Sequence, residues 1–118
     1  MRPIVKIHKT VLDGFKRRAW KAYPNEYIER ILGVCITDGF AVHILTSVNH
    51  VGGPLTVYYD HDQDDIHDTE DLTKSQFLGY IHTHIGYRVC EHFSEQDCLD
   101  AVNNNELLSG VCLLYKSG

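Results

Sequence analysis

The sequence has 118 residues and a mass of 13.5 kDa, enough for one modest hydrophobic core, so we expect a single domain over residues 1–118. Hydrophobic residues make up 43% and charged residues 23%, which argues against a mainly disordered chain. No apolar run approaches the roughly 20 residues of a membrane-spanning helix, and a net charge of −5 disfavours sequence-independent nucleic-acid binding, which depends on phosphate neutralisation.

Hydrophobic periodicity predicts eight elements in the order β-α-β-β-β-β-α-β. In chain order they are a strand over 4–7, a helix over 11–23, strands over 31–36, 40–48, 55–59 and 77–82, a helix over 94–103, and a strand over 110–115. This order predicts an α+β fold in which helices flank a mostly antiparallel sheet. Because the chain ends directly after its last apolar strand, we expect that a further strand has been removed or that the domain is minimal.

Local sequence signals support the predicted ends of these helices and strands. Thr10 is the expected N-cap of the first helix, Pro24 is its expected end, and the seven basic residues among positions 1–21 are typical of a solvated helix face. The continuous apolar run over 31–36 predicts a strand that lies centrally in the sheet. The acidic stretch over 60–71 is expected to be a loop or a poorly ordered helix edge. The spacing of its aspartates resembles that of a calcium-binding loop, but the stretch lacks the glycine and the paired helices that such a loop needs.

The cysteines indicate a reducing environment. Four cysteines are too few for a disulfide scaffold, and the N-terminus has no apolar segment of a secretory signal. We therefore expect a cytoplasmic protein. Cys35 and Cys112 lie in apolar runs, which is typical of small core residues.

A pair of histidines at the end of a predicted strand carries the strongest chemical signal. His82 and His84 are two residues apart, so on a strand they project from the same face and can bind one metal ion. Ser94 is expected to cap the next helix, which places Asp97 in its first turn. Two histidines and one aspartate, with water in a fourth position, form a catalytic zinc arrangement.

Such a site needs a base, and Glu26 is the candidate. It lies just before the predicted central strand. Partial burial there would raise the pKa of its carboxyl group and suit it to moving a proton to a leaving amine.

These residues together resemble the signature of the JAMM (MPN-plus) metalloproteases: a glutamate, then His-Ser/Thr-His-Pro, then Ser-x-x-Asp. The resemblance implies an MPN-like, cytidine-deaminase-like fold over nearly the whole chain. It implies zinc held by His82, His84 and Asp97, Glu26 as general base, and a Ser94 hydroxyl that stabilises the oxyanion. The implied reaction is hydrolysis of an isopeptide or peptide bond at the C-terminal tail of ubiquitin or a ubiquitin-like protein. The family also implies a possible homodimer or an MPN-type partner subunit.

The sequence departs from this signature in three places. Ile85 follows the second histidine where the family has proline, and the spacing from His84 to Ser94 is two residues longer than expected. Glu29 stands where a glycine is usual. Because Glu29 lies near a central strand, we expect its charge to face solvent or the active site. All five functional residues are present, which favours an active site.

Two other interpretations stay open. The chain could be a catalytically inactive MPN-like scaffold that binds a partner and no metal. It could also hold a closed structural zinc site through Cys90, His92 and Cys98.

Overall fold

The computed structural model describes residues 3–86 and 93–114. Its elements are β1 (Ile4–Ile7), α1 (Lys9–Ala22), β2 (Ile28–Ile36), β3 (Gly39–Ser47), β4 (His50–Gly52), β5 (Val57–Tyr59), α2 (Gln63–Thr73), β6 (Gln76–Ile85), α3 (Glu95–Asn103) and β7 (Leu108–Leu114). Within these ranges, no helix combines the length and the apolar character that crossing a membrane requires.

Five strands form one mixed sheet in the order β1-β3-β2-β6-β7, and β4 pairs with β5 in a separate two-stranded ribbon. The central strand β2 is antiparallel to β3 and β6, whereas the outer pairs β1–β3 and β6–β7 are parallel. The α+β class and the central place of β2 are confirmed. The expectation of a mostly antiparallel sheet is wrong for the main sheet, because α3 forms a crossover that lets β7 run parallel to β6.

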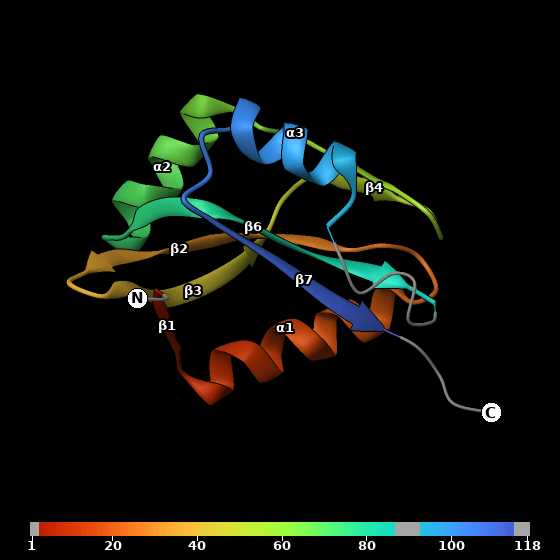
Figure 1. The fold of residues 1–118 in the computed structure, drawn as a ribbon, viewed down its shortest axis with the longest axis horizontal. Coiled ribbons are helices and arrows are strands. Elements are labelled where there is room, and N and C mark those ends of the chain that lie inside the picture. Colours follow the sequence, from red (N-terminus) through yellow and green to blue (C-terminus); the bar gives the residue numbers. More distant parts are fainter. Residues whose placement is uncertain (1–2, 87–92, 115–118) are drawn as a thin grey trace.

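Helices cover both faces of the sheet (Figure 1). α1 lies on one face, while α2, α3 and the β4–β5 ribbon lie on the other. Phe15 and Ala19 of α1 are fully buried in the main core, which also includes Ile31 and Leu78 of the sheet. A smaller cluster around Tyr80 forms on the opposite face. The hydrophobic core is therefore larger on the α1 face of the sheet than on the opposite face, where polar groups can also lie.

The acidic stretch forms helix α2, so the expectation of a loop or a poorly ordered helix edge is wrong. The side chain of Asp62 accepts the backbone N–H of Asp64 and caps the helix, and acidic residues in the first turn suit the helix dipole. Ile66 is 3% exposed and anchors the helix on the sheet. Asp65 also accepts a hydrogen bond of 2.8 Å from Arg30, a buried residue of β2. The acidic residues concealed a helix that is held by Ile66, by the Arg30–Asp65 ion pair and by a hydrogen bond from the Phe77 N–H to the Glu70 carboxylate.

Smaller predictions also need correction. His8 caps α1 in place of Thr10, since its side chain accepts the Thr10 N–H at 3.2 Å. Cys35 is exposed near the end of β2, where alternate side chains leave the core, while Cys112 is half-buried and packs against the core. The expected strand over 55–59 begins at Val57, and β6 continues past His82 to Ile85.

Glu29 faces neither solvent nor the candidate site. Its side chain is fully buried on the α1 side of β2, where it accepts hydrogen bonds from Arg18 at 2.6 and 2.9 Å. The Tyr27 hydroxyl donates a third hydrogen bond at 2.5 Å. Burial of this charge is tolerated because it is paired. Arg18 is therefore an exception to the expected solvated basic face of α1.

Candidate functional site

The register of the central strands brings Glu26 beside the histidine pair. Ile28 of β2 pairs with His82 of β6 in antiparallel register. Glu26 lies two residues before Ile28, just ahead of β2, and His84 lies two residues after His82, so the antiparallel pairing brings them together on the same face. Ligand atoms of Glu26, His82 and His84 all lie within 4.8 Å of one another. Residues nearly 60 positions apart in the sequence thus form one cluster because β2 and β6 are neighbours.

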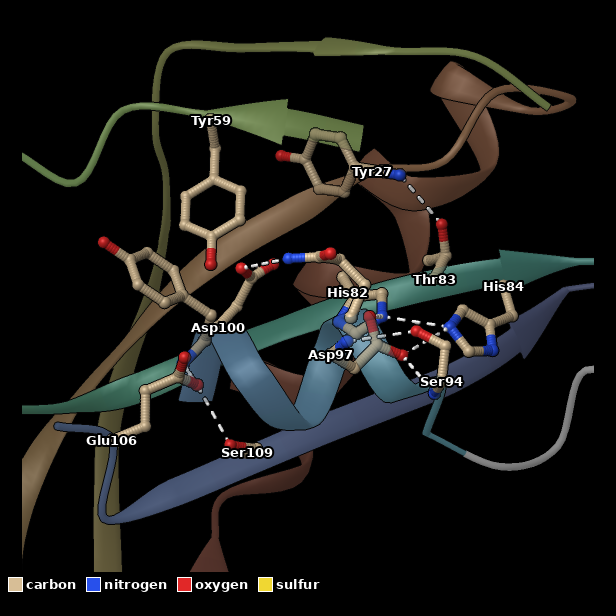
Figure 2. Close-up of polar contacts among 12 residues, drawn as sticks. Tyr27, Tyr59, His82, Thr83, His84, Ser94, Asp97, Asp100, Glu106 and Ser109 are labelled. Atoms are coloured by element: carbon tan, nitrogen blue, oxygen red, sulfur yellow. Dashed lines mark hydrogen bonds and ion pairs between the residues drawn. The ribbon is translucent and has the colours of Figure 1, made fainter. Parts of the chain in front are cut away.

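Asp97 approaches the same cluster from α3. Its two carboxylate oxygens lie 3.2 Å from the Nε2 atom of His82 and 3.1 Å from the Nε2 atom of His84. The two Nε2 atoms are 3.0 Å apart (Figure 2). The three side chains are between 11% and 17% exposed, so they are largely shielded from water.

Ser94 holds Asp97 in this position through the predicted helix cap. The Asp97 N–H donates to Ser94 Oγ at 3.0 Å, and the Ser94 N–H donates to an Asp97 carboxylate oxygen at 2.8 Å. This reciprocal arrangement is a capping box. The same carboxylate oxygen that accepts the Ser94 N–H contacts His84, so the cap orients the carboxylate toward the histidines.

Thr83 lies between the two histidines and joins β6 to Tyr27, the residue after Glu26, through two hydrogen bonds. Its N–H donates to the carbonyl oxygen of Tyr27 at 2.8 Å, and its Oγ1 accepts the Tyr27 N–H at 2.9 Å. Thr83 is fully buried, on the face opposite the histidines. This pair of bonds fixes the backbone on both sides of the cluster.

The β4–β5 ribbon holds Glu26 from the other side. The Glu26 N–H donates to the Gly53 carbonyl oxygen at 2.8 Å. At Gly52 a Cβ atom would lie 2.0 Å from the Glu26 carbonyl oxygen, so the approach of the ribbon requires glycine there.

The electrostatics of the cluster favour a neutral His82 and a charged Asp97. Burial raises the pKa of Glu26 to about 7, an effect that His84 opposes and Asp97 reinforces. Burial lowers the pKa of His82, which favours the neutral imidazole that binds metals. Burial alone would raise the pKa of Asp97, but the Ser94 N–H and the neighbouring histidines hold it below its ordinary value.

This donor set fits a zinc ion. Imidazole nitrogens and carboxylate oxygens are common zinc ligands, and a catalytic site uses three protein ligands with an open fourth position. His82 and His84 supply two ligands, and either Asp97 or Glu26 is close enough to supply the third. Of the alternative zinc residues, Cys98 is exposed on α3, whereas Cys90 and His92 lie outside the described residues.

All five predicted residues line one cleft of about 410 Å³, between the β4–β5 ribbon and α3. The cleft continues beyond them to Tyr59, Tyr80, Asp100, Glu106 and Ser109. No sequence motif includes Asp100 or Glu106. The three-residue spacing from Asp97 to Asp100, which places both on one helix face, is the signal from which Asp100 could have been found.

Comparisons with known proteins inform the fold alone. No protein-family model matches the sequence, and no curated protein matches it. Among solved structures, the chain is similar to the solution structure of protein DSY2949 from Desulfitobacterium hafniense, with a TM-score of 0.58 and 21% sequence identity. The similarity covers 80% of this chain and 64% of that one. The chain therefore spans less than two thirds of that protein and shares its fold.

Proposed function

We propose that this chain is a zinc-dependent isopeptidase or peptidase of the JAMM type, with an MPN-like fold. The observation that carries the proposal is the convergence of the His82 and His84 Nε2 atoms on Asp97, with Glu26 beside them. Nearby imidazole and carboxylate groups in a cleft are an arrangement from which metal-assisted hydrolysis is expected.

His82, His84 and Asp97 would hold the ion, and Glu26 would move protons. Zinc, when bound, supplies a Lewis acid that polarises a carbonyl group and lowers the pKa of water. Glu26 reaches the same point from the segment just before β2 and is 8% exposed, so it can take the proton of the attacking water and pass it to the leaving nitrogen. The oxygen of Ser94 accepts the Asp97 N–H, which leaves its hydroxyl hydrogen to donate to the carbonyl oxygen of the cleaved bond.

The substrate class follows from the resemblance of the sequence motif. It implies the C-terminal tail of ubiquitin or of a ubiquitin-like protein, bound as an extended segment in the cleft between the β4–β5 ribbon and α3. A homodimer or an MPN-type partner subunit belongs to the same proposal.

The first experiment measures zinc per chain and hydrolysis on protein purified without chelators. We expect about one zinc ion per chain and cleavage of a fluorogenic amide at the C-terminus of ubiquitin or a ubiquitin-like protein. Glu26→Gln should keep the zinc and lose at least about a hundredfold in rate, as expected for removal of a general base. Glu95→Gln, an exposed acid on α3, is the matched control and should leave both unchanged.

A further pair of variants separates the remaining interpretations. Zinc that is lost in His84→Ala and retained in Cys90→Ala supports the open site, whereas the reverse pattern supports a structural zinc site. A zinc-supplemented chain that binds no metal yet retains a protein partner after His84→Ala would support the inactive scaffold. An active Glu26→Gln protein would contradict the mechanism.

A further inference from the structure

Helix α3 has its polar side chains toward the cleft and its apolar side chains toward solvent. Asp97 and Asp100 line the cleft, whereas Leu99 and Val102 are 58% and 76% exposed. No residue of α3 is buried, although every one of them is described. A helix on a protein core normally has the opposite orientation. The space beneath α3 is therefore an open cleft and not a filled core.

The end of this cleft away from the histidines has aromatic walls and a negative charge. The rings of Tyr59 and Tyr80 lie with their centroids 4.7 Å apart. Glu106 accepts hydrogen bonds from the Ser109 hydroxyl at 2.9 Å and from the Tyr80 N–H at 3.2 Å. Asp100 lies across the same end of the cleft and accepts a hydrogen bond from Gln96 at 2.8 Å through one of its two carboxylate oxygens.

The balance of charge at this end of the cleft is negative among the described residues. Among the described residues that line the cleft there is neither lysine nor arginine. Arg30 lies 5.7 Å from the centre of the Tyr80 ring, but its guanidinium is paired with Asp65 of α2. Burial raises the pKa of Glu106, and hydrogen bonds from Ser109, Tyr80 and Asn104 offset this only in part, so a positive group nearby would stabilise its charged form. Aromatic faces beside carboxylates are a favourable environment for such a group.

Two exposed apolar side chains line the cleft. Leu55, between β4 and β5, is 89% exposed, and Phe93, just before α3, is 44% exposed. Exposed apolar side chains beside convergent polar groups in a cleft are typical of a binding site. The cleft thus combines an acidic end with exposed apolar side chains on the ribbon and before α3.

We infer that this cleft binds an extended polypeptide segment whose lysine or arginine side chain lies between Asp100 and Glu106, against Tyr59 and Tyr80. Leu55 and Phe93 contact apolar side chains of the same segment, and the histidine cluster faces the backbone a few residues away. The inference rests on the proposed function in one respect, that the bound segment is the substrate. It adds that the enzyme prefers a substrate with a basic residue near the cleaved bond.

The test is a pair of peptides that differ by one ammonium group. Acetyl-Leu-Lys-Leu-amide and acetyl-Leu-norleucine-Leu-amide are titrated into the ¹⁵N-labelled chain without zinc, and amide shifts of Tyr59, Tyr80 and Ser109 are followed by NMR. We expect the lysine peptide to bind about tenfold more tightly, as is typical of a charge-assisted contact. The arginine analogue should also bind more tightly than the norleucine peptide. Equal binding of all three peptides would overturn the inference.

Isosteric variants locate the effect. Asp100→Asn and Glu106→Gln should each reduce the preference for the lysine peptide several-fold. Asp71→Asn on α2 changes the net charge equally at an exposed position outside the cleft and should not alter the preference. If Asp71→Asn has the same effect as the cleft variants, the preference reflects net charge and the inference fails.

Failure of this inference and failure of the proposed function give different results. Selective binding of the lysine peptide, without hydrolysis of any substrate by the zinc-loaded chain, would leave the basic-residue site standing and refute the enzyme. Zinc-dependent hydrolysis with no preference for a basic residue would leave the enzyme standing and refute the basic-residue site.

Discussion

Replacement of Arg18 by methionine should destabilise the fold, because it leaves the charge of Glu29 buried without its partner. Glu29 is fully buried and accepts two hydrogen bonds from Arg18 and one from the Tyr27 hydroxyl. Methionine retains much of the apolar stem by which arginine packs, so the substitution mainly removes the charge and the donors.

The size of the effect follows from burial on the two sides of the pair. Removal of one partner from a fully buried ion pair costs about 3–5 kcal/mol. The Arg18 side chain is 42% exposed, so water already screens its charge, and the Tyr27 hydroxyl remains as a donor to Glu29. We therefore expect a loss of about 2–3 kcal/mol in the free energy of unfolding. In a chain of this length that corresponds to a decrease of roughly 10 °C in Tm.

Urea denaturation followed by circular dichroism measures this loss. Arg17→Met, which removes the same charge from an exposed neighbour, is the control and should cost less than about 0.5 kcal/mol. Arg18→Met/Glu29→Gln should be more stable than Arg18→Met, because no unpaired charge remains and glutamine still accepts the Tyr27 hydroxyl. The reasoning is refuted if Arg18→Met is as stable as Arg17→Met, or if the double variant recovers nothing.

Three further substitutions test how the candidate site is held. Thr83→Val removes the acceptor of the buried Tyr27 N–H and should cost about 1–3 kcal/mol, whereas Thr83→Ser should cost less, as urea denaturation would measure. Gly52→Ala adds a Cβ 2.0 Å from the Glu26 carbonyl oxygen, so it should displace the ribbon and reduce hydrolysis while zinc content, measured by elemental mass spectrometry, stays unchanged. Ser94→Ala removes the α3 cap and should lower the free energy of unfolding by about 1 kcal/mol. Ser94→Asp restores an acceptor for the cap and should be more stable than Ser94→Ala. Equal stability of the two variants in urea denaturation would contradict the capping role.

Features that depend on short sequence separations could be predicted well. The alternation of a strand places His82 and His84 on one face, and their Nε2 atoms do lie 3.0 Å apart. The Ser94-x-x-Asp97 spacing predicts a capped helix, and the capping box is present. The central place of β2 follows from its continuous apolar run, which a strand buried on both faces requires.

Features that depend on distant partners could not be predicted. Glu29 can be buried because it pairs with Arg18 of α1, and no local sequence pattern links these two residues. Helix α2 was concealed because only one of its residues, Ile66, is buried, and because its ion pair with Arg30 involves a residue 35 positions away from Asp65. The parallel pairing of β1 with β3 is likewise a tertiary choice, since the composition of a strand does not encode its direction.

The two bonds between Tyr27 and Thr83 have a consequence for the order of folding. They join residues that are 56 positions apart, so they can form only after a long loop has closed and β6 has docked against β2. Contacts of such large sequence separation form slowly, because closing the loop lowers the entropy of the chain before the contacts stabilise it. We therefore expect Glu26 and the histidines to meet only late, in chains whose central strands are already paired. Incompletely folded chains would lack the cluster, which confines its chemistry to the native state.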